Sequence, residues 1–326
     1  MGTISKITEV PIGNTLKVNG IAKSVWANLL GQIVPSGSTW TDDYGIQLDG
    51  QNDYANITLS SDPVNKEKGT IAFWFEYDQE PASTQTLLVL HDYSNGGSTA
   101  NRIIIQVYKI TTNQWCVRFF YKSTVGGTAV VNNCVAKSSS PEFGKPWARK
   151  PVNMASGNYN PMSTMTNRKH LAISWDTTSS FTNNSTSYNG AMKMYLDGVL
   201  MNVGQSTTPA HNGTGTANSM QKITGSFLNM YLGIRHHGTS NSYNSFTDGF
   251  MNDVSIYDTD LSDASIAAIY NSGVPIDLLT NSGSYINSSN LVGYWDFEGN
   301  SGTTITDSST NSNNGVLVNG GAFIGS

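Results

Sequence analysis

The chain has 326 residues and a formal net charge of −5, and only 13% of its residues are charged. This balance argues against a nucleic acid as partner, because neutralising phosphates needs clustered lysines and arginines. No run is long and apolar enough to span a bilayer, so we expect no membrane insertion. The low charge and the 32 glycines favour a polar, exposed β-protein over a cytosolic metabolic enzyme.

Residues 1–40 alternate only weakly between apolar and polar side chains, which predicts an N-terminal arm. The first ten residues, MGTISKITEV, lack the basic region and apolar stretch of a secretory signal. The rest of the chain, residues 41–326, shows the short alternating segments and turn residues of one β-domain.

Short strands separated by turn residues are predicted from residue 44 to residue 235. The Asp49-Gly50 and Asp197-Gly198 pairs are strong turn signals. A loop rich in Pro, Ser and Asn covers roughly residues 133–168. Two strands are predicted within 44–59, and further strands at 69–80, 87–91, 102–108, 114–121, 128–131, 170–176, 191–204 and 227–235.

A strand followed by one short helix is predicted between Gly249 and Gly273. Ser262 can cap the helix, Ile266 and Ile269 follow at helical spacing, and Gly273 ends it. No other segment of the chain has a convincing helical pattern. The terminal stretch 291–320 reads as two strands separated by a turn rich in Ser, Thr and Asn.

A family resemblance is carried by a series of segments in order along residues 44–320. They are LDGQNDYANI, GTIAFWFE, KHLAISWD, MKMYLDGVL, YLGIRHHG, FTDGFMNDVSIYDTDLSDASIAAIYNSG and LVGYWDFEGNSG with its continuation. Together they resemble the laminin-G-like, concanavalin A-like lectin/glucanase domain, of the type found in tailed-phage virion proteins. The resemblance implies an all-β jelly-roll sandwich of two antiparallel sheets with one short helix. It also implies binding rather than catalysis.

The order of the segments departs from the family pattern. The segment that resembles LVGYWDFEGNSG normally precedes the LDG strand, whereas here it follows the helix, at 291–320. It either returns to its usual place in its own sandwich, as a permuted C-terminal strand pair, or completes the sheet of a neighbouring protomer. We favour the first alternative, because permutation needs no partner.

Three acidic residues at the end of one predicted strand, Glu76, Asp78 and Glu80, match the E-x-D-x-E pattern of laminarinase-like hydrolases. Paired carboxylates on one face are what glycoside hydrolysis requires. Pro81 follows directly, however, and carboxylates at a strand end are commonly solvated. We therefore expect no enzymatic activity.

A calcium ion is a second hypothesis, because calcium prefers hard oxygen ligands and Asp307, Asn311 and Asn313 offer them at alternating positions of one turn. Asp253 is added as a ligand because it resembles the acidic position that holds a structural ion in some concanavalin A-like sandwiches. The alternative is a cluster of turns in which Asp307 and Asn311 bond to their own backbone. No cofactor is required.

His236 and His237 are adjacent, so on a strand they face opposite ways and cannot bind one metal together. The others, His91, His170 and His211, are scattered along the sequence, which argues against a histidine metal site.

Four aromatic residues in predicted polar loops, Trp147, Tyr159, Tyr188 and Tyr243, could stack against sugar rings. They could equally pin the long loops or pack against a neighbouring subunit.

The function expected from these features is a non-enzymatic structural protein on a phage virion. It would be a capsid decoration, fibre or tail-attached subunit that is assembled in the host cytoplasm. Its partners would be other virion proteins and further copies of itself, with a host surface glycan as an added ligand. The alternative is a carbohydrate-binding module or adhesin of a bacterial surface protein. A laminarinase-like glycoside hydrolase is the third possibility.

Overall fold

In the computed structural model the chain consists of two units, Met1–Thr41 and Asp42–Ser326. The second unit holds the β-domain. The predicted arm, residues 1–40, lies outside the described residues. Within the described part of the chain, no helix is long and apolar enough to cross a bilayer. The structure describes residues 44–78, 81–92, 101–111, 114–125, 128–137, 168–183, 186–200, 202–206, 220–237 and 242–325.

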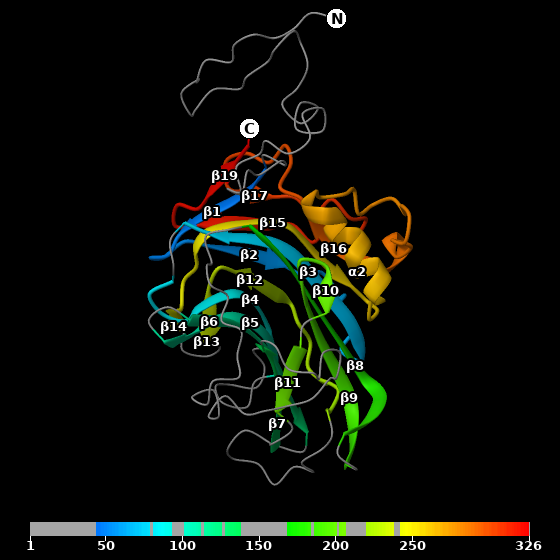
Figure 1. Cartoon of the computed structure of the whole chain (residues 1–326). Coiled ribbons are helices and arrows are strands. Elements are labelled where there is room, and N and C mark those ends of the chain that lie inside the picture. The colour runs from blue at the N-terminus through cyan, green and yellow to red at the C-terminus, as the bar shows by residue number, and fades with distance from the viewer. Residues whose placement is uncertain are drawn as a thin grey trace, which may run out of the picture. The chain divides into compact units, whose positions relative to one another are not determined.

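Two antiparallel sheets form a jelly-roll sandwich, as the sequence predicted (Figure 1). The eight-stranded sheet has the order β10 (Val199–Leu200), β9 (Thr186–Leu196), β8 (Lys169–Asn183), β3 (Lys68–Tyr77), β15 (Asp248–Tyr257), β1 (Gly45–Asp49) and β19 (Ala322–Ile324), and β16 (Leu291–Trp295) also pairs with β15. The nine-stranded sheet has the order β11 (Asn202–Ser206), β7 (Thr128–Lys137), β6 (Gln114–Val125), β5 (Arg102–Thr111), β4 (Gln85–His91), β12 (Asn229–Leu232), β2 (Tyr54–Thr58), β18 (Gly315–Val318) and β17 (Thr304–Ile305). A separate hairpin joins β13 (Arg235–His237) to β14 (Ser242–Asn244).

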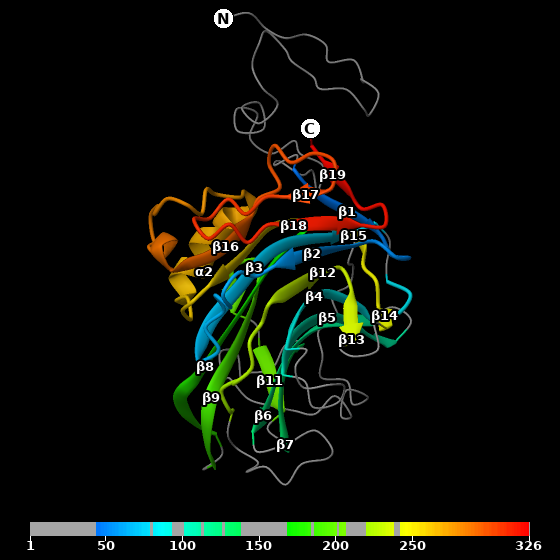
Figure 2. The same cartoon turned by 180° about the vertical axis from the view of Figure 1, so that it is seen from behind.

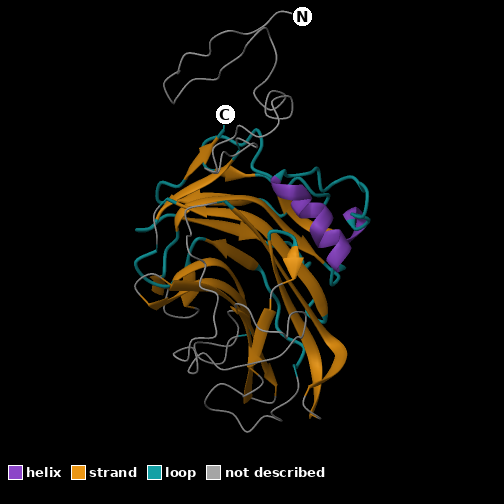
Figure 3. Cartoon of the chain, in the orientation of Figure 1, coloured by secondary structure: helices purple, strands orange, loops and turns teal. Residues whose placement is uncertain are grey.

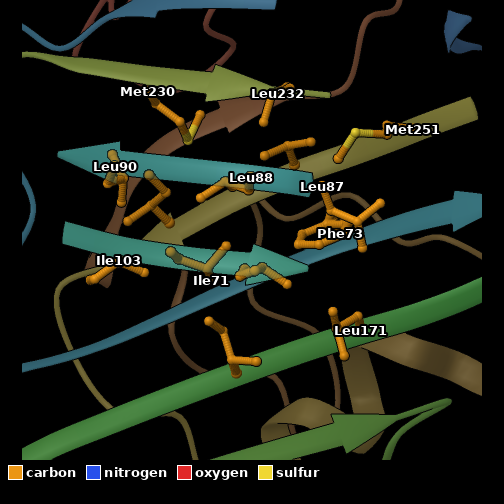
Figure 4. Close-up of a cluster of buried hydrophobic side chains, with 14 of the residues drawn as sticks. Ile71, Phe73, Leu87, Leu88, Leu90, Ile103, Leu171, Met230, Leu232 and Met251 are labelled. Carbon is orange, nitrogen blue, oxygen red and sulfur yellow. The ribbon is translucent and has the colours of Figure 1, made fainter. Parts of the chain in front are cut away.

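The main core lies between the two sheets. Alternate residues of β3, such as Ile71 and Phe73, point inward and are fully buried, because successive side chains of a strand face opposite ways. They meet Leu88 on β4, Ile103 on β5 and Met230 on β12 from the opposite sheet (Figure 4). The alternation predicted for β3 is therefore confirmed.

The helix α2 (Asp263–Tyr270) covers the outer face of the eight-stranded sheet (Figure 3). Ser262 caps it by accepting a hydrogen bond from the Ser265 backbone nitrogen at 3.1 Å. Ile266 and Ile269 are buried in a second apolar cluster with tyrosines of the sheet and of the following segment. Among the described residues α2 is the only α-helix, followed by two short 3₁₀ turns, η4 (Asn271–Gly273) and η5 (Ser288–Asn290).

The C-terminal strands return to their own sandwich (Figure 2). One edge of β15 pairs with β1 through residues 248–251 and with β16 through residues 254–257. Asp253 lies at the bulge between these two halves, with a left-handed φ of 49°. Further on, β18 pairs with β2 and β19 with β1. The predicted permuted arrangement is therefore the one that the chain adopts.

The Asp49-Gly50 turn joins two strands that do not pair with each other. Asp49 Oδ1 accepts a hydrogen bond from the Gln51 backbone nitrogen at 2.9 Å, and Gly50 adopts a φ of 71°. β1 belongs to the eight-stranded sheet and β2 to the nine-stranded sheet. The turn predicted here is present, and it carries the chain from one sheet to the other.

Candidate functional site

The outer face of the nine-stranded sheet carries an unusual set of side chains. The hairpin of β5 and β6 places Arg102 opposite Lys122, Ile104 opposite Phe120 and Gln106 opposite Arg118. The intervening residues on both strands belong to the core, so these three pairs point away from it. We call this surface the basic face; it comprises His91, Arg102, Gln106, Arg118, Phe120, Lys122, Tyr231, Arg235 and His236.

The basic face has an apolar middle. Val89, Ile104, Tyr231 and Ile234 are buried in one cluster, and Tyr54, Phe120 and Phe246 pack against it while partly exposed. Phe120 is flanked by two cations, with the Arg102 guanidinium 5.4 Å and the Arg118 guanidinium 5.9 Å from its ring centre. Such contacts are favourable between a guanidinium and an aromatic ring.

Four cationic groups gather around this middle. Burial is the main cause that lowers the pKa of Arg102 to about 10, and the neighbouring Arg235 and Arg118 lower it further. Burial, followed by repulsion from Arg102, lowers the pKa of Lys122 to about 8. Like charges directly opposite each other in a sheet are destabilising, so Arg102 and Lys122 repel each other across the hairpin.

Two of these guanidinium groups retain hydrogen-bonding capacity. The buried Nε atoms of Arg102 and Arg235 make no hydrogen bond to any residue that the structure describes. Both side chains are partly exposed at the surface of the face. A third guanidinium is held in place: Arg118 Nη2 donates to Gln106 Oε1, and Gln106 Nε2 donates to Thr86 Oγ1 at 2.9 Å.

A stack of three rings borders the cations. His91, Tyr231 and His236 have nearly parallel planes, with ring centres 4.9 to 5.7 Å apart. His91 Nε2 and His236 Nδ1 lie 3.1 Å apart, so one of them donates a hydrogen bond to the other. Burial and the adjacent His236 lower the pKa of His91 to about 3, which keeps this imidazole neutral near pH 7. His91 and His236 are 145 residues apart in the sequence, and the fold brings them together.

The predicted acidic triad does not lie on the basic face. Glu76 and Asp78 point to the outer side of the eight-stranded sheet, the side on which Trp74 packs near Tyr270 of α2. Asp78 is exposed and accepts a hydrogen bond from Gln47 Nε2 at 3.4 Å. Partial burial raises the pKa of Asp78. Glu80 lies outside the described residues.

The predicted calcium ligands bind other groups of the protein. Asp307 accepts hydrogen bonds from the backbone nitrogens of Tyr294, Ser309 and Asn313 at 2.8 to 3.0 Å. Asp253 accepts one from the Tyr294 hydroxyl at 2.6 Å, so the two carboxylates bind opposite ends of Tyr294.

The two asparagines of the predicted calcium set differ in burial. Asn313 is fully buried and accepts from the Ser60 backbone nitrogen at 2.8 Å, whereas Asn311 is exposed. Within the described part of the chain, no three His, Cys, Asp or Glu side chains are placed to hold a metal. Calcium binding stays a prediction, and these contacts match the turn alternative for Asp307.

Two of the four predicted sugar-stacking aromatics, Trp147 and Tyr159, lie outside the described residues. Tyr188 lies in β9 opposite Phe181, on the other sheet. Tyr243 lies in β14 opposite His236, and the strand register therefore brings it next to the basic face. A sugar-stacking role for these four residues stays a prediction.

Sequence reasoning missed the basic face, although a signal was present. Arg102, Ile104 and Gln106 alternate in one predicted strand, and Arg118 and Phe120 alternate in the next, with Lys122 directly after its predicted end. Because adjacent strands of a hairpin bring such residues together, two consecutive strands with the same polar face predict one mixed surface. The net charge of −5 concealed this local excess of cations.

No family model matches the sequence, and no curated protein matches it. Among solved structures, the chain is similar to a protein from Bacteroides ovatus, with 13% identity and a TM-score of 0.46, over 86% of this chain and 60% of that one. It is similar to a heptameric SAP-like pentraxin from Limulus polyphemus, with 9% identity and a TM-score of 0.45, over 88% of this chain and 97% of that one. It is also similar to the enzymatically active domain of tailspike protein 2 from bacteriophage CBA120, with 11% identity and a TM-score of 0.46, over 87% of this chain and 36% of that one. Likenesses at this level carry no argument about what the chain binds.

Proposed function

We propose that the chain is a binding protein that recognises a saccharide on its basic face. The observation that carries this proposal is the partly exposed Phe120, flanked by two guanidinium groups on a sheet surface that faces away from the core. A flat aromatic ring can pack against the apolar side of a sugar, while neighbouring amide and guanidinium groups bind its hydroxyls. Gln106 already holds Arg118 in a fixed position, which lowers the entropy lost on binding.

The experiment is a glycan array with the whole chain and two variants. Phe120→Ala removes the ring from the basic face, and we expect it to weaken every array signal at least tenfold. Val199→Ala, at an exposed position of β10 in the other sheet, is the control and should bind as the wild type does. Equal binding by wild type and Phe120→Ala would contradict this use of the face.

Binding without catalysis is part of the proposal. Glu76 and Asp78 lie on the eight-stranded sheet, whereas the basic face is on the nine-stranded sheet. A saccharide on the basic face therefore does not reach these carboxylates. We expect no release of reducing ends from β-glucans above a blank. Hydrolysis that disappears in Glu76→Gln would overturn this part of the proposal.

We further propose that the binding protein is a surface subunit of a phage virion, either a capsid decoration, a fibre or a tail-attached subunit. Support comes from the polar surface of low charge and from the resemblance of the segments along residues 44–320. Docking would use the predicted arm, residues 1–40. A carbohydrate-binding module or adhesin of a bacterial surface protein would use the same face in another setting. A particle reconstruction decides between them: density for the chain on a virion supports the first, and a monomer absent from any particle contradicts it.

A further inference from the structure

We infer that the saccharide bound by the basic face is acidic, and that its carboxylate or sulfate group binds to Arg102 and Arg235. This inference rests on the proposed function, because it names the chemical class of the ligand at the same face. It goes further in predicting that neutral saccharides bind poorly.

The first argument is the placement of the cations. Arg102 and Lys122 are directly opposite each other on β5 and β6. Arg118 also faces outward on β6, with Phe120 between it and Lys122. Arg235 begins β13, which lies beside β4 at the end of the face where His91 pairs with Arg102. Of the four polar residues that face outward on this hairpin, three are cationic and the other is Gln106. Arg235, on a separate strand, is the fourth cation of the face.

The second argument is the shortage of compensating acids. Asp92, next to His91, is an acidic residue at this end of the sheet, and its Oδ2 accepts from Asn101 Nδ2 at 3.5 Å. Neither Arg102 nor Arg235 forms an ion pair with a described residue, and the buried Nε of each makes no hydrogen bond to one. Arg102 and Arg235 repel each other and have no acidic partner among the described residues, so an anion that binds both of them removes this repulsion.

The third argument is the shape of the groups involved. A guanidinium presents its N–H groups in a planar fork that fits a carboxylate or a sulfate with two parallel hydrogen bonds. Arg102 and Arg118 lie over the Phe120 ring, so this partly exposed ring adds apolar contact for the sugar beside the two guanidinium groups rather than an open stacking face. A free inorganic anion would use the cations alone, whereas an acidic saccharide uses the cations and the ring together.

The experiment measures binding of the whole chain to matched oligosaccharides by isothermal titration calorimetry. The probes are sialylated, uronate-containing and sulfated oligosaccharides, each beside its neutral parent, methyl ester or desulfated form. We expect at least one acidic probe to bind, and its neutral form to bind at least tenfold more weakly. Arg102→Gln should lose the same factor for the acidic probe and little for the neutral one.

A matched control removes a cation elsewhere. Lys193→Gln changes the net charge equally, at a position on β9 where the lysine lies 3.6 Å from Asp263 of the helix. It should bind the acidic probe within twofold of wild type. Thermal unfolding of ligand-free Arg102→Gln checks that this variant still folds. Because the substitution removes a repelled cation, its unfolding temperature should equal or exceed that of the wild type.

The outcomes separate the two proposals. If neutral probes bind as tightly as acidic ones, the acidic ligand is wrong and saccharide binding stands. If Lys193→Gln weakens binding as much as Arg102→Gln, the effect is one of net charge and the inferred site is wrong. If an oligothymidylate binds more tightly than every saccharide, the ligand class is wrong. If no oligosaccharide binds at all, the proposed function fails and takes this inference with it.

Discussion

At the scale of single residues, burial shifts the pKa of several ionisable groups on the two sheets. Arg102 stays charged at a pKa of about 10, His91 stays neutral, and Lys122 is brought into the range in which it titrates near pH 8. The charge of the basic face near neutral pH therefore depends on Lys122 more than on His91.

Affinity for an acidic ligand should fall as the pH rises from 7 to 9. Lys122 has a lowered pKa of about 8, so it loses its charge within this interval. Arg102 faces Lys122 from β5, Arg118 lies on the same strand as Lys122, and the facing position on β7 is Val131. Among these described neighbours, none titrates between pH 7 and 9. Calorimetric titrations at constant ionic strength measure the effect.

Lys122→Met should bind more weakly at pH 7 and show no such dependence on pH. Lys122→Arg should keep the affinity at pH 9, because its guanidinium stays charged. A dependence that is unchanged in Lys122→Met would show that another group is responsible.

A buried histidine on the other sheet should make stability depend on pH. Burial, with a smaller effect of Arg168, lowers the pKa of His170 from 6.5 to about 3. The unfolded chain binds a proton below pH 6.5 that the folded chain does not, so the free energy of unfolding decreases as the pH falls from 6.5 toward 3. One such group contributes about 1.4 kcal/mol per pH unit.

Urea unfolding at pH 6.5, 5.5 and 4.5 measures this slope. His170→Gln should reduce it by that amount, whatever its absolute stability. An identical slope in wild type and His170→Gln would show that His170 is protonated in the folded chain.

At the scale of elements, Tyr294 joins the permuted strand β16 to the rest of the sandwich. Its hydroxyl donates to the buried Asp253 on β15, and its backbone nitrogen donates to Asp307 in the loop before β18. Nearby, Trp295 Nε1 donates to the Asn313 carbonyl at 2.8 Å. Asp253 and Asp307, the carboxylates proposed as calcium ligands, thus link the C-terminal strand β16 to both sheets.

Tyr294→Phe should lower the free energy of unfolding by about 1–3 kcal/mol, because the buried Asp253 carboxylate loses a donor to a charged group. Chemical denaturation measures the loss. Tyr270→Phe, at a partly exposed position on α2, is the control and should change stability by less than about 0.5 kcal/mol. A Tyr294→Phe variant as stable as this control would contradict the fastening role.

At the scale of the whole molecule, the strands could be predicted from alternation and the sheets could not. The period of two in Ile71, Phe73 and Phe75 is local, so the sequence alone showed which side faces the core. The Asp49-Gly50 turn was equally visible, yet the partners of the strands it joins lie far along the chain, in β15 and β12. Pairing at that distance leaves no local signal.

The basic face shows the same limit on predicting a functional site from the sequence. Arg102 and Arg118 stand in two predicted strands, and each alone is an ordinary exposed cation. Only the register of the β5–β6 hairpin brings both guanidinium groups to the Phe120 ring. The neighbouring Arg235 comes from a third strand, β13. The carboxylates of Glu76 and Asp78 stood out in the sequence because their motif is contiguous, but the fold places them on the other sheet.

The central claim is that a saccharide binds to the basic face, and photo-crosslinking tests it most directly. The array glycan that binds best is coupled to a diazirine, crosslinked to the whole chain, and located by mass spectrometry of the digest. We expect crosslinks within 102–106 and 118–122, and their loss in Phe120→Ala. Crosslinks confined to the strand of Glu76 and Asp78 or to α2, or the absence of any binding glycan, would contradict it.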